Sequence, residues 1–188
     1  MCSGIILFRT HVLFYLNQVL PMKKIILLII FWSSSLTIYS QAEKVTIDKA
    51  DSGLKLRVNG QDFIINGMNW DYFPIGTNFN YSLWTQPESV IKQALDDEMS
   101  LLKNMGVNTI RVYIGMPKKW IEYVYTNYGI YTMLNHSFGR YGLTIDGAWV
   151  PTTEYADAKT RKLLLKEVKE MATEYKNTKG LLLFLLGN

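Results

Sequence analysis

The sequence is poor in the residues that build covalent and metal-bound frameworks. Cys2 is the only cysteine, and the two histidines are His11 and His136. A single cysteine excludes a disulfide framework and a cysteine-based metal site, and two histidines exclude a histidine-rich one. Carboxylate sites for hard cations stay open. The chain also lacks the Gly-x-Gly-x-x-Gly turn of dinucleotide-binding folds, and we expect neither a cofactor nor a bound metal.

A strong excess of either charge is missing as well. The chain has 20 basic and 16 acidic residues, and the first forty residues contain Arg9, Lys23 and Lys24 but no acid. The rest is nearly neutral, with 17 basic and 16 acidic residues. No basic stripe or nucleic-acid-binding motif appears, and phosphate contacts need clustered Lys and Arg. We therefore expect no nucleic-acid partner.

Residues 1–40 have the pattern of a leader and signal peptide. Met22-Lys23-Lys24 is followed by the apolar run Ile25 to Trp32 and then by small residues up to Ser40. This run is short for a membrane span, so the pattern predicts cleavage near Ser40 and export to the cell envelope or beyond, with membrane contact only through the signal segment. Met22 is then the expected start. For residues 1–21 an unused upstream start and a longer membrane-associated N-terminus both stay open.

Residues 41–62 predict an N-terminal β-hairpin segment. Val45–Lys49 and Leu54–Val58 alternate apolar and polar residues, which is the period of a half-exposed strand. Asn59-Gly60 is a strong signal for a two-residue hairpin turn, because both residues tolerate positive φ. Residues 63–66 are expected to form the return strand.

From residue 63 onward the patterns alternate between strand and helix. Short apolar runs predict four strands, and apolar residues at helical spacing predict three helices between them. Glycines mark the helix ends, and Thr85–Glu88 and Asp157 are the expected caps of the first and third helix. The expected strands are 67–70, 107–113, 130–134 and 181–186, and the expected helices are 85–105, 117–128 and 157–179.

Two long loops interrupt these elements. The loop from Asp71 to Trp84 is dense in aromatic residues, which either pack on one another or form a wall of rings for stacking on a sugar. The second loop runs from Phe138 to Tyr155. The run Leu181–Leu186 has no polar residue and predicts a strand covered on both faces, as in a parallel sheet.

The fold class that follows is α/β, with about four parallel strands and three helices. These elements occupy 126 residues, and doubling them gives about 250, the usual length of a (β/α)8 barrel. The competing fold is a doubly wound sheet, whose nucleotide-binding form needs a short Gly-rich turn that is absent here. We therefore predict a partial (β/α)8 TIM barrel, with residues 63–188 as its first half and the remainder missing.

Four stretches carry a family resemblance. The second and third include expected joints between helix and strand, and the fourth lies at the carboxyl end of the last expected strand. The stretches are Val58 to Trp70, Met105 to Tyr113, Trp120 to Tyr131, and the terminal Leu-Leu-Gly187-Asn188. Together they resemble the large clan of (β/α)8 glycoside hydrolases, most closely the barrel domain of glycoside hydrolase family 2, with relatives in family 5 and among the β-glucanosyltransferases.

This resemblance implies a retaining O-glycosidase that acts on oligo- or polysaccharide through two carboxylates. Asn188 matches an Asn that holds the sugar 2-hydroxyl, and the acid/base Glu is expected directly after it. The nucleophile is expected at the end of the seventh strand. Arg111 matches an Arg that pairs with the nucleophile. The other positions that match substrate-contacting residues are His136, Trp70, Tyr113 and Trp149.

Each of these residues also has a structural interpretation. Arg111 is alternatively an internal ion-pair partner, His136 a loop residue, Asn188 a strand terminus, and Trp149 a packing residue of its own loop. Because neither catalytic carboxylate lies in the chain, we expect an inactive fragment of a secreted enzyme. The alternative functions are a non-catalytic carbohydrate-binding fragment, a β-glucanosyltransferase and a membrane-tethered interaction protein.

Overall fold

The computed structural model describes residues 42–51, 53–113 and 115–187, which belong to one compact unit, Gln41–Asn188. The predicted signal peptide and Asn188 lie outside the described residues. Among the described residues, no helix combines the length and the apolar character that a membrane span requires.

The body begins with the predicted hairpin. Strand β1 (Val45–Ala50) pairs antiparallel with β2 (Gly53–Val58), which turns into β3 (Gln61–Asp62). Asn59 and Gly60 have φ of 51° and 82°, so the predicted two-residue turn is confirmed. The predicted return strand at 63–66 is wrong, because the tight turn brings Gln61 opposite Val58 and the pairing ends soon afterwards.

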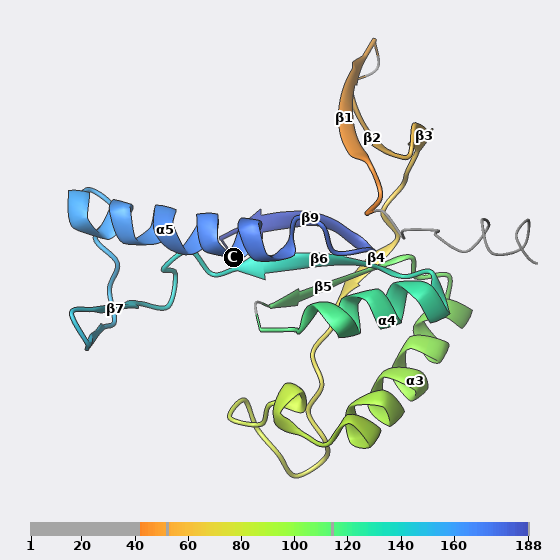
Figure 1. The fold of residues 1–188 in the computed structure, drawn as a ribbon, viewed down its shortest axis with the longest axis horizontal. Helices are drawn as coiled ribbons and strands as arrows, with labels where there is room; N and C mark the ends of the chain where they lie inside the picture. Colours follow the sequence, from red (N-terminus) through yellow and green to blue (C-terminus); the bar gives the residue numbers. More distant parts are fainter. Residues whose placement is uncertain (1–41, 52, 114, 188) are drawn as a thin grey trace, which may run out of the picture. The chain divides into compact units, whose positions relative to one another are not determined.

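Four parallel strands form the central sheet (Figure 1). They are β4 (Gly67–Asn69), β5 (Thr109–Tyr113), β6 (Tyr131–His136) and β9 (Leu181–Leu186), and they lie side by side in chain order. The predicted parallel α/β arrangement with three helices is confirmed. Within the described residues, β4 and β9 each have a strand neighbour on one side only, and the sheet does not close.

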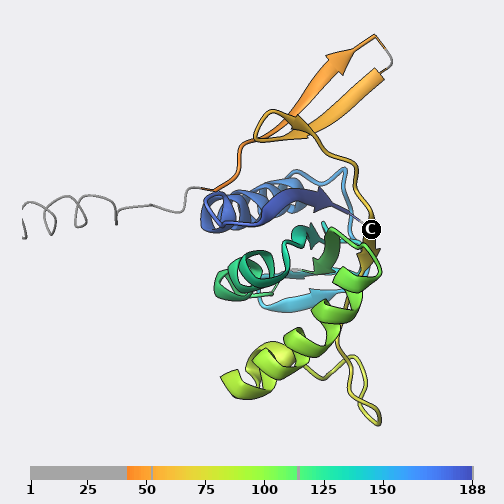
Figure 2. The same ribbon diagram turned by 90° about the vertical axis from the view of Figure 1, so that its right-hand side faces the viewer.

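The three helices cover one face of this sheet. They are α3 (Glu88–Asn104), α4 (Lys118–Tyr128) and α5 (Ala158–Tyr175), and Figure 2 shows α4 and α5 beside one another on one side of the strands. Ile110, Val112 and Leu134 of the strands share one buried cluster with side chains of all three helices. These helix residues are Leu95, Met99, Ile121, Val124, Met171 and Tyr175.

The ends of the helices correct three predictions. Thr85 does not cap α3; it ends the short 3-10 helix η1 (Leu83–Thr85), and its hydroxyl donates to the Ser82 carbonyl, 2.9 Å away. Met105 follows the last turn of α3 and is 66% exposed, so it does not belong to the buried face. Gly180 does not end α5, which stops at Tyr175.

Other predicted helix ends are confirmed. Gly106, which follows the C-cap Met105 of α3, has a φ of 81°, and Gly129 is the left-handed cap of α4. Asp157 caps α5, because its Oδ2 accepts a hydrogen bond from the Thr160 amide at 2.7 Å.

Two further expectations fail for identifiable reasons. β9 is not covered on both faces, because the helices pack on one face of the sheet only: Leu182 is buried, but Leu186 is 54% exposed. The loop 138–155 contains a second hairpin, β7 (Leu143–Ile145) with β8 (Ala148–Val150). Asp146-Gly147 forms its turn, with φ of 51° and 81°.

A tie from the N-terminal segment reaches the start of β9. Oε2 of Glu43 accepts a hydrogen bond from the Gly180 amide at 2.8 Å. Two features favour glycine at position 180: its φ is 81°, and a Cβ there would lie 2.3 Å from the Cβ of Tyr125. The tie therefore joins the hairpin end of the body to the sheet.

A partly buried carboxylate joins α3 to α4. Oδ1 of Asp96 accepts from the hydroxyls of Tyr123 and Tyr128, each at 2.5 Å, and Oδ2 accepts from Lys92 Nζ at 2.5 Å. These hydrogen bonds, the one from Lys92 first, lower the pKa of Asp96 to about 2. Burial, together with the hydrogen bond to Asp96, raises the pKa of Tyr128 to about 12. The ionised carboxylate thus holds the two helices together.

We predict that Asp96→Asn lowers the free energy of unfolding at pH 7 by about 1–3 kcal/mol, the usual loss for hydrogen bonds to a charged group. Because the folded-state pKa of Asp96 lies below its ordinary value, its contribution is complete above about pH 4 and is lost as pH falls toward about 2. Urea denaturation at pH 7 and pH 3 should show the difference between the two proteins shrinking at the lower pH.

Asp97→Asn is the matched control. Asp97 is exposed and accepts only a neutral hydrogen bond from Gln93 among the described residues, so we expect a change below about 0.5 kcal/mol. A loss as large as that of Asp96→Asn would contradict the role given to the tyrosine hydroxyls.

Candidate functional site

A polar cluster lies on the face of the sheet that the helices leave open. In parallel pairing, Asn69 of β4 is in register with Arg111 of β5, and Tyr113 of β5 with Asn135 of β6. Successive strand residues point to opposite faces. Since Ile110 and Val112 face the helices, Arg111 and Tyr113 face the other way. We call Asn69, Arg111, Tyr113 and Asn135 the inner-face cluster.

Arg111 is the centre of this cluster. Its Nη2 donates to Asn135 Oδ1 at 2.8 Å, and its Nη1 lies 3.5 Å from Asn69 Oδ1. The guanidinium carbon lies 5.7 Å from the centroid of the Tyr113 ring, within cation–π range. The positive charge is therefore held in place by two amides and one ring, at the carboxyl ends of three neighbouring strands.

Asn135 carries an unsatisfied donor. Its side chain is fully buried, and within the described part of the chain its Nδ2 has no hydrogen-bond partner. Buried polar atoms are nearly always paired, so an orphaned one needs a physical explanation. An acceptor beside Arg111 can come from an ordered water, from a ligand or from another segment of polypeptide.

The cluster offers binding chemistry. A guanidinium binds planar anions such as carboxylates, while the amide groups and the phenol hydroxyl of Tyr113 suit hydroxyl-rich ligands. Among the described residues, no three His, Cys, Asp or Glu side chains are placed to hold a metal ion.

His136 lies on the opposite face from the cluster. It follows Asn135 in β6 and is 7% exposed. The Phe138 amide donates to its Nδ1 at 3.0 Å, so the neutral ring carries its proton on Nε2, which lies 3.6 Å from Oε2 of Glu167 in α5. The structure does not bring His136 to Arg111, because neighbouring strand residues alternate between faces.

Trp149 shares a cavity with His136. It lies on β8, is 61% exposed, and lines a cavity of about 470 Å³ together with His136 and Glu167. A Cβ at Gly142 would lie 2.7 Å from the Trp149 ring, so this close approach needs a glycine. Two of the predicted substrate-contacting residues therefore come together here, away from the inner-face cluster.

Trp70 and Tyr113 differ in accessibility. Trp70 is 7% exposed, packs in the core with its ring 6.2 Å from that of Trp84, and has an Nε1 without a partner among the described residues. Tyr113 is 44% exposed and presents its ring beside Arg111. Of the aromatic residues proposed for stacking, Tyr113 is the one that the structure places with Arg111. Asn188 lies outside the described residues.

Sequence reasoning missed Asn69 and Asn135. Each lies at or next to the carboxyl end of its strand, on the same face as Arg111. Two-residue periodicity places Asn135 on the opposite face from Leu134 once the third strand is extended to His136, but its position beside Tyr113 depends on the register.

No family model and no curated protein matches the chain. Among solved structures, it is similar to the Amycolatopsis orientalis exo-chitosanase CsxA, with 17% identity and a TM-score of 0.47. It is also similar to the structure of a complex of an A. orientalis CsxA variant with PNP-beta-D-glucosamine, with 16% identity and a TM-score of 0.48. For a structure from an inhibition study of the exo-beta-D-glucosaminidase CsxA, the identity is 17% and the TM-score 0.46. Each match covers 76% of this chain and 15% of the other. Matches at this identity and TM-score do not assign a function.

The orphaned donor of Asn135 leads to a prediction about stability. Asn135→Asp keeps the shape, removes Nδ2 and gives Arg111 a carboxylate in place of an amide oxygen. We expect the free energy of unfolding at pH 7 to rise by about 1 kcal/mol, because charge-assisted hydrogen bonds are stronger than neutral ones. The gain should disappear at acid pH, as the new carboxylate is protonated.

Asn69→Asp is the matched control for this measurement by urea denaturation. Asn69 is exposed and lies farther from Arg111, so the same chemical change should give no more than a few tenths of a kcal/mol. A destabilised Asn135→Asp protein would show that the buried Asn135 does not have Arg111 as its main partner.

Proposed function

We propose that this sheet is the first half of a (β/α)8 barrel of an exported retaining β-glycoside hydrolase. The inner-face cluster then forms part of the wall of its saccharide site. Three features support the barrel: the strands lie in chain order, all are parallel, and the helices cover only one face. In such barrels the site lies at the carboxyl ends of the strands, where Arg111, Asn69 and Asn135 meet.

In this proposal, the catalytic carboxylates come from strands that follow residue 188. One Glu directly after Asn188 acts as acid/base, and a second at the end of the seventh strand is the nucleophile. Retaining hydrolysis needs the two about 5–5.5 Å apart. The nucleophile attacks the anomeric carbon as the acid protonates the leaving oxygen, and water then releases the sugar.

Arg111 has a defined role in that scheme. A guanidinium next to the nucleophilic carboxylate lowers the pKa of that carboxylate and keeps it ionised for attack. The two amides fix the guanidinium before the carboxylate arrives, so little side-chain entropy is lost on pairing. This placement of Arg111, between two amides on the open face, is the observation that carries the proposal.

The saccharide itself is met by the remaining groups. In this proposal, Asn135 Nδ2 donates a hydrogen bond to a sugar hydroxyl, and the exposed Tyr113 ring stacks on a sugar face. Asn188 is proposed to hold the sugar 2-hydroxyl. The same site would act as a β-glucanosyltransferase if a sugar hydroxyl, in place of water, attacked the glycosyl-enzyme.

The test compares two lengths of chain. We expect the 188-residue protein to show no hydrolysis of aryl β-glycosides, and a protein extended through the remaining strands to hydrolyse at least one. Turnover by the short chain would contradict the assignment of the carboxylates. Glycan binding by both lengths with no turnover in either would instead support a non-catalytic carbohydrate-binding role.

In the extended protein, Arg111→Ala should lower kcat/KM by about 100-fold or more, since removing one partner of a buried charge pair costs about 2–5 kcal/mol. Arg140→Ala is the control, because Arg140 is an exposed loop residue and its loss should change kcat/KM less than about twofold. Equal losses in the two variants would remove Arg111 from the site.

A further inference from the structure

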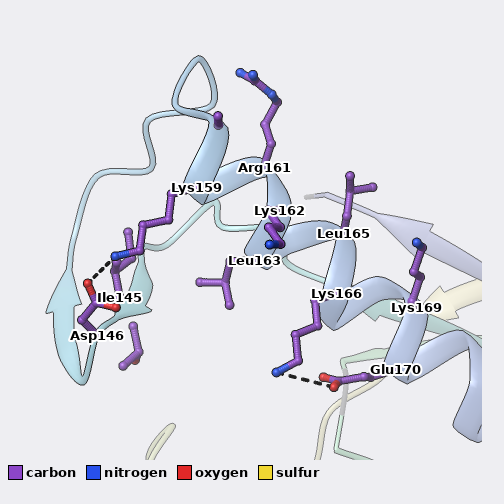
Figure 3. A pocket seen from close by; sticks show the side chains of 12 residues that line it. Ile145, Asp146, Lys159, Arg161, Lys162, Leu163, Leu165, Lys166, Lys169 and Glu170 are labelled. Atoms are coloured by element: carbon purple, nitrogen blue, oxygen red, sulfur yellow. Dashed lines mark hydrogen bonds and ion pairs between the residues drawn. The ribbon is translucent and has the colours of Figure 1, made fainter.

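Helix α5 carries a concentration of positive charge on its solvent face. Five cations lie within eleven residues: Lys159, Arg161, Lys162, Lys166 and Lys169. All five are exposed, while Thr160, Leu164 and Met171 bury the other side of the helix. Figure 3 shows these side chains spreading from α5. We call them the α5 basic patch; it spans about 15 Å, given the 1.5 Å rise per helical residue.

The patch borders a groove between α5 and the β7–β8 hairpin. A cavity of about 860 Å³ is lined by all five cations, with Ile145 and Leu163 as apolar surface and Asp146 and Glu170 as its acidic residues. Cations therefore outnumber acids by three in the lining. The groove combines apolar contact area with a positive rim, which suits an elongated anionic ligand.

Within the described residues, only part of this charge is neutralised. Lys159 pairs with Asp146, and Lys166 lies 3.8 Å from Glu170 (Figure 3). Lys162 and Lys169 have no acidic partner in the described part of the chain. These two lysines thus present charge that an incoming anion can use.

The arrangement is unfavourable for α5 in the absence of an anion. Lys159 and Arg161 lie in the first turn of α5, where the helix dipole is positive, and the acid at this end is the N-cap Asp157. Lys162 and Lys166 are four residues apart, and like charges at this spacing destabilise a helix. A bound anion would offset both effects.

The patch also corrects an expectation from the sequence. The near-neutral body gave no basic stripe, because that count mixes the lysines of α5 with glutamates that lie on another side of the same helix. Glu167 and Glu174 line the cavity with His136 and Trp149, whereas the lysines line the larger groove. The two kinds of charge are thus largely separated around α5, although Glu170 lines both cavities.

We propose that the α5 basic patch binds a linear acidic polysaccharide, one whose repeating sugars carry carboxylates. The choice of a glycan over other polyanions rests on the function proposed above; the anionic character rests on the patch itself. Several evenly spaced carboxylates contact the cations, while the sugar faces lie against Ile145 and Leu163. The patch would hold the polymer apart from the inner-face cluster, which lies on the opposite face of the sheet from α5.

The test uses oligogalacturonate and its methyl-esterified form, which has the same backbone without the charge. We expect calorimetry on the 188-residue chain to show binding of the acidic form at low ionic strength, weaker binding at high ionic strength, and none of the esterified form. Lys162→Glu combined with Lys169→Glu should weaken binding by about tenfold or more, as two attractions become repulsions.

Lys49→Glu combined with Lys103→Glu is the matched control, with the same change in net charge at exposed positions outside α5. An equal loss in the control, an unchanged affinity in the α5 variant, or no binding by the parent chain would overturn the proposal. Equal affinity for a single-stranded DNA of the same length would also overturn it, in favour of a nucleic-acid site.

The two proposals can fail separately. In the extended protein, the α5 variant should keep its turnover of a neutral aryl glycoside while losing the acidic glycan. Binding that depends on the α5 lysines, without turnover in any extended protein, would leave the patch standing and remove the glycosidase.

Discussion

The architecture depends on apolar burial along a single face of a parallel sheet. Ile110 of β5 and Leu134 of β6 are fully buried and pack against helices on that face. The residue that follows each of them in its strand points to the other face. This alternation alone sets Arg111 and Asn135 on the opposite face, clear of the helices. Burial of the apolar positions therefore positions the polar cluster, and the cluster needs no dedicated loop to hold it.

Much of the fold could be read from the chain because its signals are local. Asn59-Gly60 correctly predicted one hairpin turn, and Gly106 and Gly129 correctly predicted two helix ends. The failures arose where a local signal was overlooked or met a competing one. Asp146-Gly147 is as clear a turn signal as Asn59-Gly60, yet short strands around it gave no periodicity. Thr85 had a capping pattern, but the proline at position 87 placed the start of the helix after it.

The candidate site was predictable in its centre and poorly predictable around it. Arg111 stands out in the sequence as a cation in an apolar strand, so it could be selected as a site residue from that strand alone. Its partners come from strands 42 and 24 residues away, so they depend on register, which the sequence does not specify. His136 directly follows Asn135 in β6, and neighbouring strand residues point to opposite faces, so His136 does not join the cluster.

The hydrogen bond between Glu43 and the Gly180 amide joins residues that are 137 positions apart. On the ribosome, Glu43 emerges on the order of ten seconds before Gly180 does, at typical elongation rates. For that interval the Glu43 side chain lacks its hydrogen-bond partner at the start of β9. The hairpin end can therefore dock only after Gly180, the residue that precedes β9, has been synthesised.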